Sequence, residues 1–321
     1  MSTNMRIVAV ERTLHLPRSP QPIDLATLER NGWPAPGTAA FKAINPPTLA
    51  DTGQEKITAM DTACLWRMFS SEISNSPQTA RDYWGLNIWV QLLANRGYAV
   101  LQPNFRGSTG YGRKHLHAGD RQWGLAMQDD LTDAVKWAVA EGIADPARIA
   151  IVGGSYGGYA TLAGASFTPE LYRCAVDFCG PSNLATLIKS FAPYWNLRAI
   201  WNARVGNPDD PADTELLRGA SPLFAVEQIR IPMLIMQGAN DVRVIQAESE
   251  QIVSAIEKNG GRVTYVVYSD EGHGLVRPAN HKDALGRMEK FLADHLGGRY
   301  EPMDGDRVEG SSAAVQEIGN R

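Results

Sequence analysis

The amino-acid sequence predicts an α/β fold, with a mostly parallel sheet and helices on both of its faces. From about residue 83, short apolar runs alternate with amphipathic segments, which is typical of repeated βα units. Several apolar runs lead directly into loops that contain Gly, Asp or His, as strand ends in open α/β sheets do. The chain has 321 residues, of which 44% are hydrophobic, and this is enough to bury a large core.

The first part of this region predicts alternating helices and strands. Helical spacing of apolar residues is present before the first strand and again after a Gly-rich loop, where the second helix closes at Gly142. In chain order the predicted elements are a helix at 89–93, a strand at 98–103, the loop at 106–112, a helix at 127–138 and a strand at 148–152. This last strand runs into a Gly-rich turn and then into a helix rich in Ala and Gly.

The second part continues the same alternation. The predicted elements are a strand at 174–178, an irregular helical region at 191–201, a strand at 232–237, a helix around 252–256, a strand at 263–268 and a closing helix at 285–292. Aromatic residues gather in the irregular region, where they line a substrate pocket or pack in the core: Phe191, Tyr194, Trp195 and Trp201.

Both ends of the chain differ from this pattern. Residues 1–80 are rich in proline and show no helical stripe, so the sequence predicts no domain there and an α/β domain at 81–299. Residues 300–321 lack apolar periodicity and are predicted to be a disordered tail.

Composition excludes several classes of partner. With 31 basic and 35 acidic side chains the net charge is −4, which does not fit a nucleic-acid binder or a polybasic membrane binder. No stretch approaches the roughly 18 apolar residues of a membrane span, and the apolar run 7–10 is too short for a signal peptide. Three cysteines (Cys64, Cys174 and Cys179) are too few for a disulfide framework or a zinc site. We therefore expect a cytoplasmic protein.

The most informative motif is Gly153-x-Ser155-x-Gly157, which follows an apolar strand and opens a helix. A nucleophilic serine needs such a sharp turn, because its hydroxyl must project from the sheet and the flanking backbone must pass closely. The helix behind it offers N–H groups and a positive dipole end to a developing oxyanion. The alternative interpretation is a Gly-rich strand-to-helix turn without chemistry.

A serine hydroxyl needs a base, and the base needs an orienting carboxylate. Asp241 follows the predicted strand 232–237 and His273 follows the strand 263–268. This gives the chain order Ser, Asp, His that is typical of α/β-hydrolases, with all three residues after strand ends. The sequence therefore predicts a catalytic triad.

Other polar candidates are weaker. His115 and His117 have no carboxylate or cysteine at ligand spacing, so no metal site and no cofactor is predicted. Packing or surface roles explain His281 and His295 in the closing helix. Asp129 and Asp130 are interpreted as acidic residues in the first turn of a helix.

Four ordered motifs resemble the catalytic domain of the prolyl oligopeptidase family, in its acylaminoacyl-peptidase and dipeptidyl-aminopeptidase branch. They are Gly97 to Gly112, Gly153 to Tyr159, Gly238 to Val244 and Glu271 to Gly274. The resemblance implies an α/β-hydrolase fold with Ser155 as nucleophile, His273 as general base and Asp241 as its orienting acid. It also implies that the backbone N–H of Tyr156 is an oxyanion donor and that Arg243 binds a substrate carbonyl.

Two departures from the family pattern bear on function. About 80 residues precede the domain, where the family usually has a β-propeller, so we expect no propeller and a more open site. The family's His-Gly-Gly-Pro loop, which supplies a second oxyanion contact, has no counterpart at Ser74 to Gln78. Residues 63–69 supply a substitute strand and loop, or the N-terminal segment is a rearranged replacement.

The predicted function is a serine hydrolase that cleaves small carboxylic esters or short aminoacyl and peptide substrates through an acyl-enzyme on Ser155. The alternative is a non-catalytic, hydrolase-like protein whose oxyanion hole is incomplete. A dinucleotide-binding enzyme is disfavoured, because Gly107, Gly110 and Gly112 lack the required order before a helix.

Overall fold

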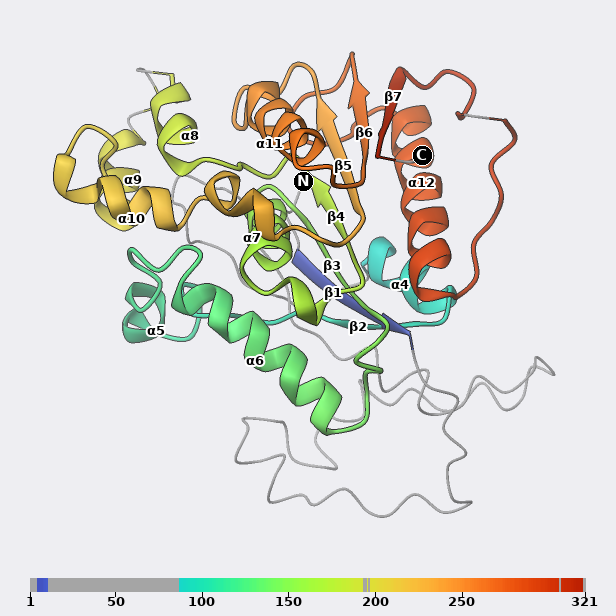
Figure 1. Ribbon diagram of the computed structural model, residues 1–321, viewed down its shortest axis with the longest axis horizontal. Coiled ribbons are helices and arrows are strands. Elements are labelled where there is room, and N and C mark those ends of the chain that lie inside the picture. The colour runs from blue at the N-terminus through green and yellow to red at the C-terminus, as the bar shows by residue number, and fades with distance from the viewer. Residues whose placement is uncertain (1–4, 11–86, 193–194, 196, 306, 320–321) are drawn as a thin grey trace.

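A seven-stranded sheet organises the molecule (Figure 1). The structure is a computed structural model, and it describes residues 5–10, 87–192, 195, 197–305 and 307–319. The strand order is β2-β1-β3-β4-β5-β6-β7. The strands are β1 (Met5–Val10), β2 (Tyr98–Leu101), β3 (Ile149–Gly154), β4 (Cys174–Phe178), β5 (Met233–Gly238), β6 (Val263–Tyr268) and β7 (Ala313–Ile318).

The four strands from β3 to β6 are parallel to one another. Strand β1 pairs antiparallel with both β2 and β3, and β7 pairs antiparallel with β6. The parallel strands are buried on both faces and consist mostly of apolar residues, as such strands require. The predicted α/β fold with a mostly parallel sheet is confirmed.

Helices cover both faces of this sheet. On the face with α4 (Ile88–Asn95) and α12 (Pro278–Leu296), the strand residues Ala150 and Val152 enter one apolar core. On the other face, Ile149 and Ile151 enter a second core with α6 (Ala126–Ala140), α7 (Tyr156–Phe167) and α11 (Gln246–Lys258). This alternation is the two-residue period of a strand, and Figure 1 shows α12 and α6 on opposite sides.

The described part of the chain also contains four shorter helices. They are α5 (Arg113–His117), α8 (Leu184–Ser190), α9 (Arg198–Arg204) and α10 (Thr214–Gly219). Short 3₁₀ turns lie at Pro169–Leu171, Pro211–Asp213 and Pro222–Gln228. Of the predicted aromatic set, Phe191 and Trp201 are buried in the α6 and α7 core and Trp195 packs against it. Tyr194 lies outside the described residues.

The N-terminal segment contributes to the sheet. Residues 1–80 could not be assigned from sequence, yet Met5–Val10 forms β1, with Met5 opposite Gly153 and Ile7 opposite Leu101. The boundary expected at residue 81 therefore does not separate the first residues from the α/β domain. The segment 63–69 proposed as a substitute strand lies outside the described residues.

The prediction that residues 300–321 form a disordered tail is wrong for β7. This strand pairs with β6 along its whole length, from Ala313 opposite Tyr268 to Ile318 opposite Val263. Only those two β7 residues are buried, and the four between them are exposed. Backbone hydrogen bonds hold an edge strand of this kind, so it needs no apolar periodicity to form.

Where the structure describes the chain, no helix combines the length and the apolar character needed to cross a membrane.

Candidate active site

Ser155 occupies a strained turn between β3 and α7. Its φ of 56° and ψ of −116° are unusual for a residue with a side chain. Its N–H donates to the carbonyl of Phe178 in β4, at 2.8 Å. A Cβ added to Gly153 would lie 2.2 Å from the carbonyl oxygen of Gly157, so the turn can close only with glycine there. This is the local geometry that the motif predicts for a nucleophile.

The structure brings the three predicted triad residues together. His273 Nε2 lies 2.9 Å from Ser155 Oγ, and His273 Nδ1 lies 2.6 Å from Asp241 Oδ2. Ser155 and Asp241 are buried, and the His273 side chain is 9% exposed. Both distances are within hydrogen-bonding range, so a proton can pass from the serine hydroxyl to the imidazole.

The loop after β5 orients the Asp241 carboxylate. Its Oδ1 accepts hydrogen bonds from the backbone N–H groups of Arg243 and Val244, at 2.8 and 2.9 Å. Its other oxygen, Oδ2, is the one that contacts His273. The two backbone donors therefore fix the carboxylate rotation that presents Oδ2 to the imidazole.

Glu271 closes the loop that carries His273. This buried carboxylate accepts hydrogen bonds from the N–H groups of Val276 and Arg277 and from the side-chain amide of Asn280, at 2.8 to 2.9 Å. The loop is thus tied to the first turn of α12. The sequence shows Glu271 only as part of the Glu271 to Gly274 motif, because the partners that define its role lie at the start of the following helix.

Cys179 lies beside the triad and was not predicted to do so. Its sulfur, a ring nitrogen of His273 and a carboxylate oxygen of Asp241 all lie within 4.8 Å of one another. Burial disfavours the charged imidazole, but the Cys179 sulfur and the Asp241 carboxylate outweigh it and raise the pKa of His273 above its ordinary value. The sequence shows only that Cys179 directly follows the predicted strand 174–178, and it does not show which strands are neighbours in the sheet.

Asp177 supports the same region from within β4. Its Oδ1 accepts a hydrogen bond from the N–H of Gly180 at 2.8 Å, and its Oδ2 is buried without a partner in the described structure. Burial raises the pKa of this carboxyl from 3.8 to about 7, and the bond from Gly180 opposes the rise.

Aromatic side chains surround the residue after the serine. The Tyr156 ring is buried and lies 4.5 Å from the Trp123 ring and 5.2 Å from the Phe105 ring, measured between centroids. Tyr156 is also the first residue of α7, so its N–H has no partner one turn earlier in the helix. That position suits the predicted oxyanion donor.

The other candidate side chains take no part in the two hydrogen bonds that join the triad. Arg243 is exposed beside Asp241. His117 Nδ1 contacts Asp120 Oδ2 at 2.8 Å, and the rings of His281 and His295 pack against Trp89 and Phe291.

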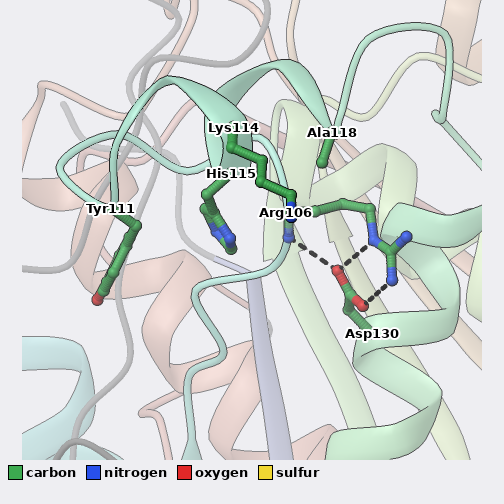
Figure 2. A pocket seen from close by; sticks show the side chains of 6 residues that line it. All are labelled: Arg106, Tyr111, Lys114, His115, Ala118 and Asp130. Carbon is green, nitrogen blue, oxygen red and sulfur yellow. Dashed lines mark hydrogen bonds and ion pairs between the residues drawn. The ribbon is translucent and has the colours of Figure 1, made fainter.

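The Gly-rich loop that carries the first family motif borders a pocket of about 370 Å³ (Figure 2). Asp130 binds Arg106 through three hydrogen bonds of 2.6 to 2.8 Å, two of them from the guanidinium. Asp130 therefore fixes this loop through Arg106, whereas the sequence indicated only an acidic residue in the first turn of a helix. The lining residues are Arg106, Tyr111, Lys114, His115, Ala118 and Asp130, and none belongs to the triad.

Comparison with known proteins agrees with this geometry. The model of the prolyl oligopeptidase family matches residues 84–299. The chain belongs to the prolyl oligopeptidase family. The resemblance expected from its four motifs is thereby confirmed, and the matched residues include the whole Ser155, Asp241 and His273 constellation.

Two relatives illustrate the relationship within the prolyl oligopeptidase family. Dipeptidyl aminopeptidase BIII of Pseudoxanthomonas mexicana is 51% identical over 237 residues, which are 74% of this chain and 34% of the relative. Dipeptidyl peptidase family member 6 of Caenorhabditis elegans is 46% identical over 242 residues, covering 75% of this chain and 33% of the relative. The chain thus spans about a third of the length of these curated relatives.

Solved structures show the same fold. A puromycin-hydrolyzing peptidase of Mycobacterium tuberculosis matches with a TM-score of 0.64 and 29% identity, over 71% of this chain and 34% of that chain. An uncomplexed acylaminoacyl peptidase of Pyrococcus horikoshii matches with a TM-score of 0.58 and 26% identity, over 67% of this chain and 35% of that chain. Both likenesses agree with a peptidase catalytic domain of the α/β-hydrolase type.

Proposed function

We propose that this chain is the catalytic part of a serine peptidase that releases dipeptides from the N-terminus of peptides through an acyl-enzyme. The observation that carries the proposal is the continuous contact from Ser155 Oγ through His273 to Asp241 Oδ2, in a chain of the prolyl oligopeptidase family.

In the first step, Ser155 Oγ attacks the carbonyl carbon of the scissile bond while His273 Nε2 takes its proton. Asp241 stabilises the imidazolium that forms and holds Nδ1–H toward its carboxylate. The imidazolium then protonates the leaving amine, which leaves an ester on Ser155. Water, deprotonated by His273, attacks this ester and regenerates the serine.

The negative charge of each tetrahedral intermediate develops near the start of α7. We assign the backbone N–H of Tyr156 as one oxyanion donor, because it is the first N–H of this 12-residue helix and lies next to Ser155. The segment in which the family carries a second donor falls outside the described residues. Arg243 remains our candidate for binding a substrate carbonyl, since its exposed side chain adjoins Asp241.

The relatives favour the peptide substrate. Those at 51% and 46% identity carry the names dipeptidyl aminopeptidase and dipeptidyl peptidase. A triad that forms an acyl-enzyme also cleaves activated esters, because acyl transfer is common to both reactions, but none of the matches cited favours an ester. They likewise give no support to the non-catalytic alternative. The cytoplasmic location and the independence from cofactors stay predictions.

The test compares the wild-type protein with Ser155→Ala on a dipeptidyl p-nitroanilide, an aminoacyl p-nitroanilide and a short-chain p-nitrophenyl ester. We expect the wild type to prefer the dipeptidyl anilide, and we expect Ser155→Ala to lose at least about 10⁴-fold in kcat. Ser254→Ala, which changes an exposed serine of α11, is the matched control and keeps full activity.

The outcomes separate the alternatives. Ester cleavage without anilide cleavage would establish an esterase and contradict the peptidase proposal. A folded wild-type protein that turns over none of the three substrates would support the non-catalytic alternative. Equal activity of Ser155→Ala and the wild type would remove Ser155 from the mechanism.

A further inference from the structure

Three side chains beside the nucleophile form a group that peptide hydrolysis does not explain. The Cys179 sulfur, a carboxylate oxygen of Asp241 and a ring nitrogen of His273 lie within 4.8 Å of one another. The three residues follow β4, β5 and β6, which are adjacent in the sheet, so their loops meet at one edge. Triad chemistry accounts for Asp241 and His273 but gives no role to a thiol.

The backbone holds Cys179 in place. Its φ of 44° lies in the left-handed region, which a residue with a side chain adopts at a cost. Its N–H donates to the carbonyl of Met236 in β5 at 2.9 Å, which extends the pairing of β4 with β5 past the end of the strand. The side chain is buried. The thiol is therefore directed toward the triad by the sheet itself and is not a freely rotating surface group.

The three donors suit a soft divalent cation. Thiolate, imidazole and carboxylate are the ligands that Zn²⁺ takes in proteins, usually in tetrahedral geometry at about 2.0 to 2.3 Å. With bonds of that length in tetrahedral geometry, two ligand atoms of the same ion lie a little over 3 Å apart. Separations below 4.8 Å can reach this arrangement through small rotations of the side chains. The contact between His273 and Asp241 would open by less than 1 Å.

We propose that Cys179, Asp241 and His273 bind Zn²⁺ or a similar soft divalent cation, and that this binding reversibly blocks the nucleophile. An ion on His273 Nδ1 leaves the remaining ring proton on Nε2, so Nε2 cannot accept the proton of Ser155. An ion on Nε2 occupies the position that faces Ser155 directly. Either arrangement removes the general base. The binding stands by itself, whereas the inhibition rests on the proposed function.

Binding releases protons to solvent. The cysteine binds as a thiolate, so the thiol proton leaves when the sulfur takes the metal, and an imidazolium must also lose one proton. Affinity is therefore expected to fall as the pH is lowered. Removing the ion with a chelator reverses these steps and restores the base.

The experiment measures binding first, in the full chain carrying Ser155→Ala, so that catalysis plays no part. We expect about one Zn²⁺ per chain by equilibrium dialysis, and a sulfur-to-metal absorption band when Co²⁺ replaces Zn²⁺. Adding Cys179→Ala is expected to weaken binding about tenfold or more and to abolish the band. Cys174→Ala and Cys64→Ala are the controls and are expected to keep both; Cys174 lies in the core on the α4 and α12 face.

Inhibition is measured second, in chains that retain Ser155, each relative to its own rate without metal. Zn²⁺ is expected to inhibit the wild type and Cys174→Ala, and a chelator is expected to restore their activity. We expect Zn²⁺ to inhibit Cys179→Ala at least about tenfold less strongly.

Unchanged Zn²⁺ affinity in Cys179→Ala, or a Co²⁺ spectrum without the sulfur band, would overturn the site. Binding that depends on Cys179, in a chain that shows no turnover at all, would uphold the site and contradict the proposed function instead.

Discussion

Two residues at the ends of neighbouring strands, Ser155 and Cys179, share an uncommon backbone. Each has a positive φ, 56° and 44°, and each donates its N–H to a carbonyl of the next strand in the sheet. Ser155 donates to Phe178 of β4, and Cys179 donates to Met236 of β5. The same device therefore directs a hydroxyl and a thiol toward one histidine, and the sheet pairing supplies the stabilisation that offsets the strain.

The buried carboxyl of Asp177 gives a prediction for stability. Its pKa is about 7 in the folded protein against 3.8 otherwise, so the folded state keeps a proton that the unfolded state releases. This group therefore makes the free energy of unfolding of the wild type fall as the pH rises from about 4 to about 7. Asp177→Asn removes the titration and keeps an oxygen for the N–H of Gly180. We expect the variant to be more stable than the wild type at pH 7.5 by a few kcal/mol.

Urea unfolding of both proteins at pH 4.5 and at pH 7.5 checks this expectation. Other titrating groups cancel in the difference between wild type and variant, so the difference in unfolding free energy should grow with pH. A difference that is the same at both pH values would show that Asp177 is ionised throughout.

The triad could be predicted from sequence because Ser155, Asp241 and His273 each follow a recognisable apolar strand. The proximity of Cys179 could not, because it depends on which strands are neighbours. The pairing of β4 between β3 and β5 is a property of the sheet order, and the sequence shows only the chain order. Glu271 was hidden for a related reason, since its partner Asn280 belongs to the following helix.

The packing of α7 against β4 depends on glycine. A Cβ added to Gly158 would lie 2.2 Å from Asp177 Oδ1 and 2.7 Å from the Cα of Gly180, and backbone atoms cannot move aside. Gly158→Ala is therefore expected to lower the unfolding free energy by about 3 kcal/mol or more. It also displaces the helix that begins next to Ser155, so kcat should fall with stability.

Gly219→Ala is the matched control for Gly158→Ala. Gly219 ends α10, and an added Cβ there would meet no atom within 4 Å. Denaturant unfolding of the two variants side by side should show a loss only for Gly158→Ala. Equal stability of both would mean that α7 can shift away from β4 without cost.

Elements with a strong apolar pattern were predictable, and those held mainly by backbone pairing were not. Strands β4 and β6 have the residue ranges expected from their apolar runs. Strand β7 has four exposed residues between two buried ones, so its pattern does not differ from that of a loop. Strand β1 is a short apolar run in a proline-rich segment, and only its pairing with β2 and β3 identifies it.

The C-terminal segment is connected to the active site through Asn280. The Asn280 side-chain oxygen accepts hydrogen bonds from Ser311 Oγ and the N–H of Ser312, at 3.0 and 2.8 Å. Its amide group donates to Glu271 Oε1, and Glu271 holds the loop of His273. Asn280 is fully buried, so loss of its partners leaves a polar oxygen unsatisfied.

Deletion of residues 311–321 is expected to affect both stability and turnover. It removes β7 and the hydrogen bonds from Ser311 and Ser312 to Asn280. We therefore expect the Tm to fall by roughly 5 °C or more and kcat/KM on the dipeptidyl anilide to fall as well. Gln316→Ala, an exposed change within β7, is the control and should alter neither quantity. An unchanged Tm in the deletion variant would show that β7 adds nothing to the stability of the sheet.

The position of β1 also constrains how the chain folds as it is synthesised. Residues 5–10 are synthesised well before one of their partners, β3, which ends at Gly154. Contacts this distant in sequence form slowly, and an unpaired apolar strand can meanwhile associate with other chains. The pairing of β1 with β3 therefore forms only after the chain has been made through Gly154, and a chaperone that shields β1 until then would raise the yield of folded protein.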